Sequence, residues 1–311
     1  MTTEPRPWRR AWHDALYGEN GFFRVSTPAN HFSTSAHLGA FAGAVAEIVH
    51  RNGFASVVDL GAGGGEMLAA LRPLVGADIE LIGVELARRP PGLDPDIGWC
   101  EEMPQRIDGL LMANEWLDNI PCDIVEVDDA GVVRLLLVDA TTGKESLGKP
   151  YRSAWLDEWW PLTRPGERAE VGDARDVAWA DAVARVEGLA IAIDYGHTRT
   201  GGRPPLGTLR SYADGHEVDV VPDGSRDVTA HVAVDSVASA TGSGILRQRD
   251  ALAVLGIDGH RPPLDLARTE PADYLRALSV AGEAGELLAR GGLGDFWWLV
   301  SDPRGRGTLE A

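Results

Sequence analysis

The sequence has few cysteines and no long hydrophobic run. Its two cysteines, Cys100 and Cys122, form no C-x-x-C pair among 311 residues, which excludes a disulfide-stapled module and fits a reducing cytoplasm. The apolar stretch at residues 38–46 is about half the length that a membrane-spanning helix requires, so we expect no membrane insertion. Residues 1–21 are polar and lack the apolar core of a secretory signal. Together these absences predict a cytoplasmic location.

Positive charge is also scarce. The chain carries 29 lysine and arginine residues against 47 acidic residues, which gives a net charge of −18. A nucleic-acid partner would require clustered lysine and arginine, so we expect none. The acidic balance is compatible with a cationic substrate, although solubility is the simpler explanation. With 44% hydrophobic residues in 311, the chain can bury a core as one elaborated domain or as two.

The most informative segment is an apolar run followed by a glycine-rich turn. Residues 55–60 read as a buried strand with a carboxylate, Asp59, near its end. Three alternate glycines follow, namely Gly61, Gly63 and Gly65. Apolar residues at helical spacing come next, and a second apolar run, residues 79–84, ends at Glu85. This order of strand, glycine turn, helix and acid-terminated strand is that of the mononucleotide-binding βαβ unit.

The spacing within the turn indicates which nucleotide is bound. A dinucleotide fingerprint starting at Gly61 needs a glycine at position 66, but that residue is Glu66, whose carboxylate would oppose a pyrophosphate. A ligand without phosphates fits better, and the Asp-x-Gly-x-Gly-x-Gly spacing is that of S-adenosylmethionine (SAM) sites. We therefore expect the three glycines to contact the methionine part, Asp59 to face its amino group, and Glu85 to bind the ribose. An ordinary tight turn without a ligand is the alternative.

The rest of the chain alternates between strand and helix patterns, which predicts an α/β fold with a doubly wound parallel sheet. The predicted elements are a helix at 36–52, strands near 97–100 and 109–112, a hairpin at 124–138, a helix at about 174–187 and a strand at 189–193. Ligands of such sheets bind beyond the carboxyl ends of the strands. Polar residues that occupy these ends are Asp59, Glu85, Asn114, Glu115 and Asp194.

Several sequence blocks resemble one methyltransferase family. The blocks are Gly21-Phe22-Phe23, His31-Phe32-Ser33-Thr34-Ser35, the glycine motif from Asp59 to Gly65, Ala113-Asn114-Glu115-Trp116-Leu117-Asp118-Asn119-Ile120-Pro121, Ile193-Asp194-Tyr195-Gly196, Gly207-Thr208-Leu209-Arg210 and Asp227-Val228-Thr229-Ala230-His231-Val232. In this order they are similar to the blocks of the MidA-type SAM-dependent methyltransferases. The mitochondrial member of that family methylates an arginine of a respiratory complex I subunit during assembly.

The resemblance implies a class I SAM-methyltransferase fold, which is a Rossmann-like doubly wound sheet with an N-terminal helical cap and inserted or C-terminal substrate elements. On this basis residues 1–52 would be the cap segment and residues 53–311 the catalytic domain, with inserts at about 121–172 and 201–290. The chain is shorter than typical members, mostly in these inserts, which leaves the identity of a protein substrate open. The resemblance further implies transfer of a methyl group from SAM to an arginine side chain of a protein.

The sequence offers a hypothesis for the reacting end of the site. If a helix begins near Glu115, then Glu115 and Asp118 lie one turn apart on the same face. Next to Asn114, the two carboxylates would bind a guanidinium in bidentate fashion and accept its proton. The alternative is a helix N-terminus whose acids complement the helix dipole. The histidines His197, His216 and His231 have no recognised metal spacing, so we predict no metal.

Two other functions stay open at this stage. A small-molecule O- or N-methyltransferase is favoured by the shortened inserts. A non-catalytic assembly factor that binds SAM is a function of a different class, and the intact residues Asp59, Glu85, Asn114 and Glu115 count against it. An open, acidic cleft beyond Glu115 would favour the protein arginine substrate, whereas a small, apolar cleft would favour the small molecule.

Overall fold

A computed structural model describes residues 4–25, 39–213 and 215–309. Its centre is a seven-stranded sheet in the order β16-β17-β10-β5-β2-β3-β4. Strands β10, β5, β2, β3 and β4 pair in parallel, and β17 runs antiparallel to both of its neighbours. The strands span β2 (Ser56–Leu60), β3 (Glu80–Val84), β4 (Ile97–Cys100), β5 (Leu110–Asn114), β10 (Leu189–Asp194), β16 (Gly244–Arg247) and β17 (Trp297–Ser301). This confirms the predicted doubly wound α/β sheet.

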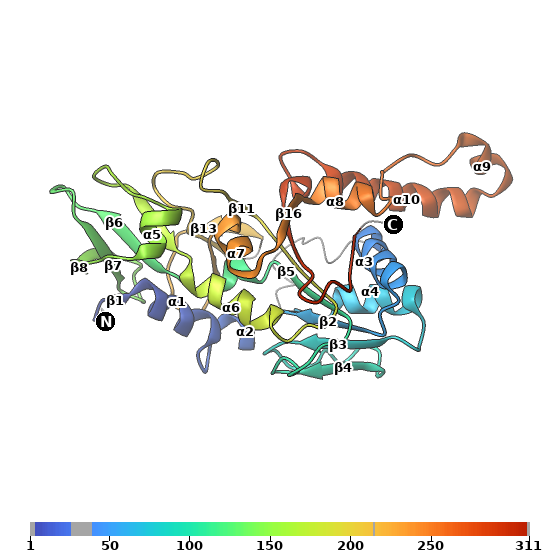
Figure 1. The fold of residues 1–311 in the computed structure, drawn as a ribbon, viewed down its shortest axis with the longest axis horizontal. Coiled ribbons are helices and arrows are strands. Elements are labelled where there is room, and N and C mark those ends of the chain that lie inside the picture. Colours follow the sequence, from blue (N-terminus) through green and yellow to red (C-terminus); the bar gives the residue numbers. More distant parts are fainter. Residues whose placement is uncertain (1–3, 26–38, 214, 310–311) are drawn as a thin grey trace.

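Helices cover both faces of the central sheet (Figure 1). Helices α3, α4, α8 and α10 pack on one face, and α6 and α7 pack on the other. Strand β10 shows why both faces bury: Leu189, Ile191 and Ile193 join the first cluster, whereas Ala190 and Ala192 join the second. The helices are α3 (Gly39–Asn52), α4 (Glu66–Val75), α6 (Asp173–Val183), α7 (Val234–Thr241), α8 (Gln248–Val254) and α10 (Pro271–Leu288).

A second, antiparallel sheet lies beside the central one (Figure 1). Its order is β1-β7-β6-β9, and β8 pairs with β7. The strands are β1 (Arg6–Pro7), β6 (Asp123–Val127), β7 (Val133–Val138), β8 (Glu145–Pro150) and β9 (Arg168–Val171). Helix α1 (Trp8–Tyr17) packs on one face and α5 (Ala154–Trp159) on the other, and α2 (Phe22–Val25) follows α1. The helices α1 and α2 therefore pack on the second sheet, whereas α3 packs on the central one.

Short elements connect the two sheets and extend the C-terminal part. They are η3 (Leu117–Asn119), β11 (Gly196–His197), β12 (Arg210–Ala213), β13 (His216–Val218), β14 (Asp227–Thr229), β15 (Val232–Ala233), α9 (Leu264–Thr269) and η4 (Leu293–Asp295). Strand β12 pairs with β13 and β14, and β11 pairs with β15. Strand β14 contacts both α1 and η3, so it is positioned between the two sheets.

Most predicted elements occur, with differences at their ends. The hairpin is β6 and β7, joined by a turn in which the carboxylate of Asp128 accepts hydrogen bonds from the backbone N–H groups of Ala130 and Val132. The helix expected to reach residue 187 ends at Val183, because the chain then turns to pair Val186 with Ile107. The block at 31–35 lies outside the described residues.

Candidate active site

A cavity of about 540 Å³ opens beyond the carboxyl ends of the central strands. The chain runs from β2 outward through β3 and β4 and then returns to β5 on the other side of β2. This reversal is the topological switch point at which doubly wound sheets bind ligands. The volume lies within the range of small-molecule sites, roughly 300–1,000 Å³. The cavity is therefore positioned and sized for a nucleotide-like ligand.

The glycine-rich turn forms one wall of the cavity. Gly61, Gly63 and Gly65 have φ angles of +77°, +55° and +77°, a region that side-chain-bearing residues rarely adopt. The N–H groups of Gly61 and Ala62 donate to the carbonyl of Val84, which fixes the turn to the end of β3. The turn therefore needs glycine for its backbone shape. Gly61 and Gly63 line the cavity as predicted, whereas Gly65 does not, and a Cβ at Gly65 would meet Leu93.

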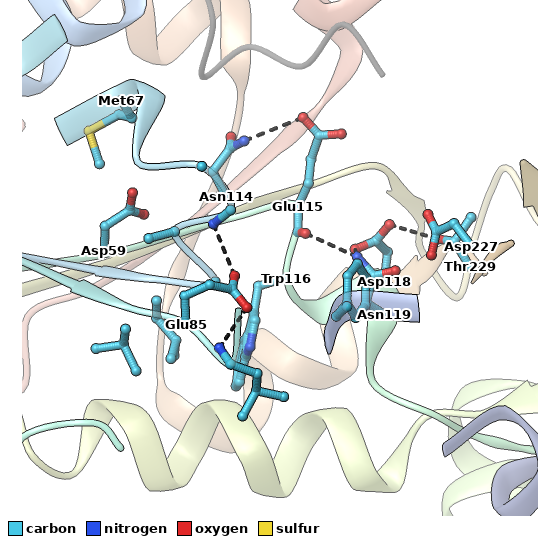
Figure 2. A pocket seen from close by; sticks show the side chains of 18 of the residues that line it. Asp59, Met67, Glu85, Asn114, Glu115, Trp116, Asp118, Asn119, Asp227 and Thr229 are labelled. Atoms are coloured by element: carbon cyan, nitrogen blue, oxygen red, sulfur yellow. Dashed lines mark hydrogen bonds between the residues drawn. The ribbon is translucent and has the colours of Figure 1, made fainter. Parts of the chain in front are cut away.

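The carboxylate of Glu85, the residue after β3, binds the backbone of the glycine turn. Its Oε2 accepts a hydrogen bond of 3.0 Å from the N–H of Gly63, and its Oε1 accepts bonds from the N–H groups of Leu86 and Ala87. Burial raises the pKa of the Glu85 carboxyl, although these three backbone donors oppose the shift. The carboxylate is thereby held in one orientation at the cavity, as Figure 2 shows.

Asp59, at the end of β2, faces the same cavity with an uncompensated charge. Only 4% of the residue is exposed, and no described residue donates a hydrogen bond to its carboxylate. Burial, together with the negative charges of Glu85 and Glu66, raises the pKa of Asp59 to about 7. A cationic group in the cavity would stabilise the ionised carboxylate and so oppose this shift.

Glu115 adopts a backbone conformation that is unusual for a residue with a side chain. Its φ angle is +51°, and it is the one non-glycine residue among those described with a positive φ. Its N–H donates to the carbonyl of Ile193 at 2.8 Å, and its own carbonyl accepts a bond from the amide of Asn119. Its carboxylate accepts a bond from the amide of Asn114. Such a conformation costs about 1–2 kcal/mol and is typical of functional sites.

The predicted helix beginning near Glu115 is wrong. A left-handed residue cannot continue into a right-handed helix, and only the short η3 follows. The carboxylates of Glu115 and Asp118 therefore do not share a helical face. Figure 2 shows the first turned toward Asn114 and the second toward Thr229.

Asp118 lies at the opposite end of the cavity from the glycine turn, and only 3% of it is exposed. Its Oδ2 accepts hydrogen bonds from the hydroxyls of Tyr195 and Thr229, and its Oδ1 accepts one from the amide of Asn119. Burial raises the pKa of Asp118, and the hydroxyl donors partly oppose the shift. All of these bonds fix the carboxylate, so the anion is oriented by its surroundings.

The buried Arg175 of α6 holds the segment that carries Asp118. Its guanidinium donates to the backbone carbonyls of Asp118, Ile120 and His231, at 2.7, 3.2 and 2.7 Å. We expect Arg175→Met to lower the free energy of unfolding by about 3 kcal/mol or more, because three buried carbonyls lose a charged donor. The matched control is Arg185→Met, which removes a single bond, to the carbonyl of Met103. Urea unfolding of both variants measures the difference; equal losses would contradict the prediction.

Other residues that line the cavity were not predicted from the sequence. Tyr17 comes from α1, Tyr212 from β12, and Asp227 and Thr229 from β14. Their sequence positions show no periodicity or spacing relative to the glycine turn, so only the tertiary fold brings them there. In contrast, Asp194 occupies a strand end as predicted but does not line the cavity. Its carboxylate accepts hydrogen bonds from the backbone N–H groups of Asp118 and Tyr195 instead.

The cavity is acidic along its whole length. Its acidic lining residues are Asp59, Glu66, Glu85, Glu101, Glu115, Asp118 and Asp227. No lysine, arginine or histidine is among the described residues that line it. In the part of the chain that the structure describes, no group of three potential ligands could hold a metal ion. The lining is therefore electrostatically complementary to organic cations.

The fold and the site together have the architecture of a nucleotide-binding α/β protein with an acidic cavity, and comparisons identify the family. Residues 83–248 match the family model described as "Putative S-adenosyl-L-methionine-dependent methyltransferase". The chain belongs to this family of SAM-dependent methyltransferases, of which the MidA-type proteins are members. A search of the curated proteins finds no match.

Two crystal structures of one superfamily from Burkholderia thailandensis are similar to this chain. The first, with bound S-adenosyl-homocysteine, has a TM-score of 0.78 at 23% identity and covers 96% of this chain and 88% of that one. The second, an uncharacterised protein in its native form, has a TM-score of 0.75 at 23% identity and covers 98% and 89%. These likenesses show the SAM-methyltransferase fold.

The residues present fit SAM as the cofactor. The buried carboxylate of Asp59 would hold the ammonium of the cofactor, and the space beside Gly63 would admit it. None of the described residues that line the cavity is a lysine, arginine or histidine that would pair with a phosphate.

Proposed function

We propose that this SAM-dependent methyltransferase acts on an arginine side chain of a protein. The observation that supports the proposal is the acidic cavity, which continues from the glycine turn past Glu115 to Asp118. A guanidinium keeps its positive charge at all physiological pH values, so it requires such a lining to enter a buried site. We further propose that residues 53–311 form the catalytic domain and that the inserted sheet binds the acceptor protein.

The cofactor end is assigned to the residues predicted from the sequence. Gly61 and Gly63 would contact the methionine part through their backbone, Gly65 would shape the turn behind them, and Asp59 would bind the ammonium. Glu85 would accept hydrogen bonds from the ribose hydroxyls, as acids at this position of the βαβ unit do. When bound, SAM supplies an activated methyl group on a sulfonium, so the protein's task is alignment.

The acceptor end is assigned to Asn114, Glu115 and Asp118. Asn114 orients the Glu115 carboxylate through the hydrogen bond between their side chains. Glu115 would bind the guanidinium and take the proton that its nitrogen loses as the nitrogen–carbon bond forms and the sulfur–carbon bond breaks. Asp118, fixed by Tyr195 and Thr229, would contribute its charge without moving. Correct alignment of the two reactants can contribute roughly 7–11 kcal/mol.

Two alternatives remain to be compared with this proposal. A small-molecule acceptor would have to be cationic as well, because the lining is acidic over its whole length. A SAM-binding assembly factor without turnover would leave the left-handed Glu115 unexplained. Purified protein incubated with methyl-labelled SAM and a cell lysate distinguishes them. Labelled methylarginine after acid hydrolysis of the protein fraction supports the proposal, whereas label only in small molecules, or none at all, contradicts it.

The cofactor assignment is tested with Gly63→Val. No atom except the end of the Glu66 side chain lies within 4 Å of a Cβ at Gly63, so the valine would project into the cavity from a strained backbone. We expect at least a 100-fold loss of affinity for SAM in calorimetric titration. Gly131→Val is the matched control, because Gly131 has a φ of +78° and open space in the hairpin turn. Equal binding by both variants would contradict the assignment.

A further inference from the structure

One carboxylate at the acceptor end of the cavity has no assigned function. Asp227, the first residue of β14, lines the cavity with only 6% of its surface exposed. Its Oδ1 is buried and has no hydrogen-bond partner among the described residues. Figure 2 shows it beside Thr229 and next to Asp118. A buried carboxylate oxygen without a partner is costly, so its presence in a residue of the cavity wall calls for a ligand.

Asp118 alone is poorly suited to bind such a ligand. It already accepts bonds from Tyr195, Thr229 and Asn119. Asp227, by contrast, forms no ion pair among the described residues, and the buried cation nearby, Arg175, donates its hydrogen bonds to backbone carbonyls. Among the described residues at this end of the cavity, Asn119 Oδ1 and Asp227 Oδ1 are buried without a hydrogen-bond partner, and of the two only Asp227 carries a negative charge.

We infer that Asp227 binds the cationic group of the methyl acceptor, with Asp118 as a fixed second charge behind it. The inference deepens the proposed function and rests on it, since it names the residue that selects a cationic acceptor. A planar guanidinium has several N–H donors and can satisfy the free oxygen of Asp227 while another edge faces Glu115.

The electrostatics of the cavity support this assignment. Burial, followed by the charge of Asp118, raises the pKa of Asp227 to about 7. Two neighbouring buried carboxylates that resist ionisation are stabilised when a cation enters between them. A neutral acceptor of the same shape would provide no such stabilisation, so the site would discriminate against it.

The test uses methylguanidinium chloride as a probe for the cation and methylurea as its neutral isostere. Both are titrated, with NMR detection, into protein saturated with S-adenosylhomocysteine. We expect the wild type to bind methylguanidinium and to bind methylurea at least tenfold more weakly. Asp227→Asn should lose at least tenfold in methylguanidinium affinity while its affinity for S-adenosylhomocysteine changes less than threefold. The matched control is Asp219→Asn, an exposed acid in the same connection, which should behave like the wild type.

Unchanged methylguanidinium binding in Asp227→Asn, or none in the wild type, would overturn the inference. Labelling of lysate proteins separates this failure from that of the proposed function. If the products contain methylarginine but Asp227→Asn does not change probe binding, the arginine activity stands and the inference about Asp227 fails. If Asp227→Asn loses probe binding but no methylarginine forms, the cation site stands and the arginine acceptor is contradicted. Asp227→Ser serves if the asparagine variant does not fold.

Discussion

The Glu115→Gln variant is expected to lose methyl transfer by about 10²- to 10⁴-fold while its affinity for S-adenosylhomocysteine changes little. Glutamine keeps the length of the side chain, and its amide oxygen can still accept the hydrogen bond from Asn114. It cannot take a proton from a guanidinium nitrogen, nor can it neutralise the charge of the acceptor. The defect should therefore appear in turnover and not in cofactor binding.

The measurement is single-turnover methylation of lysate proteins, with calorimetry of cofactor binding beside it. Glu101→Gln is the matched control, because Glu101 lines the same cavity and is exposed after β4. We expect that control to retain activity within a few-fold. Should Glu115→Gln still methylate arginine at the wild-type rate, Glu115 would not be the proton acceptor, and its left-handed backbone would need another explanation.

The second large effect is expected for Asp59→Asn. Removal of the carboxylate should weaken SAM binding at pH 7.5 by at least 100-fold, because a buried charged hydrogen bond to the ammonium is lost. The wild type should also show a pH dependence that the variant lacks. Since burial raises the pKa of Asp59 to about 7, the carboxyl of the free protein is protonated in mildly acidic solution. Affinity should fall roughly tenfold from pH 7.5 to pH 6, and below pH 7 the binding of SAM should release a proton from Asp59.

Although Asp59→Asn should weaken SAM binding, it should stabilise the fold of the free protein. The raised pKa means that the neutral form of Asp59 stabilises the fold fully below pH 3.8 and that this contribution is lost as the pH rises through about 7. The shift corresponds to roughly 4 kcal/mol at most. We therefore expect free Asp59→Asn to unfold at a higher urea concentration than the free wild type at pH 7.5. A destabilised variant, or pH-independent SAM binding in the wild type, would contradict this account of the site.

The cofactor half of the site could be predicted from the sequence because its residues are local. The strand at 56–60, the glycine turn and Glu85 lie within about thirty positions, and their chemistry follows from covalent connectivity and backbone conformation. Alternating apolar residues likewise predict strands such as β10, which buries both of its faces. The expected placement of Asn114 and Glu115 at a strand end is confirmed for the same reason.

The acceptor half could not be predicted, because it depends on contacts between distant segments. Asp118 was expected on a helix face with Glu115, but Tyr195 and Thr229, which lie 77 and 111 positions away, bind its carboxylate and turn it elsewhere. Asp227 lies more than a hundred positions from the glycine turn, and the pairing of β14 with β12 helps to bring it to the cavity.

The sequence by itself determined the doubly wound sheet, the cofactor class and the strand ends at which a ligand binds, since local patterns encode all three. The tertiary structure alone decided which acids face one another in the cavity. Burial then set their pKa values, because desolvation depends on every segment packed around a carboxylate and not on its neighbours in the chain.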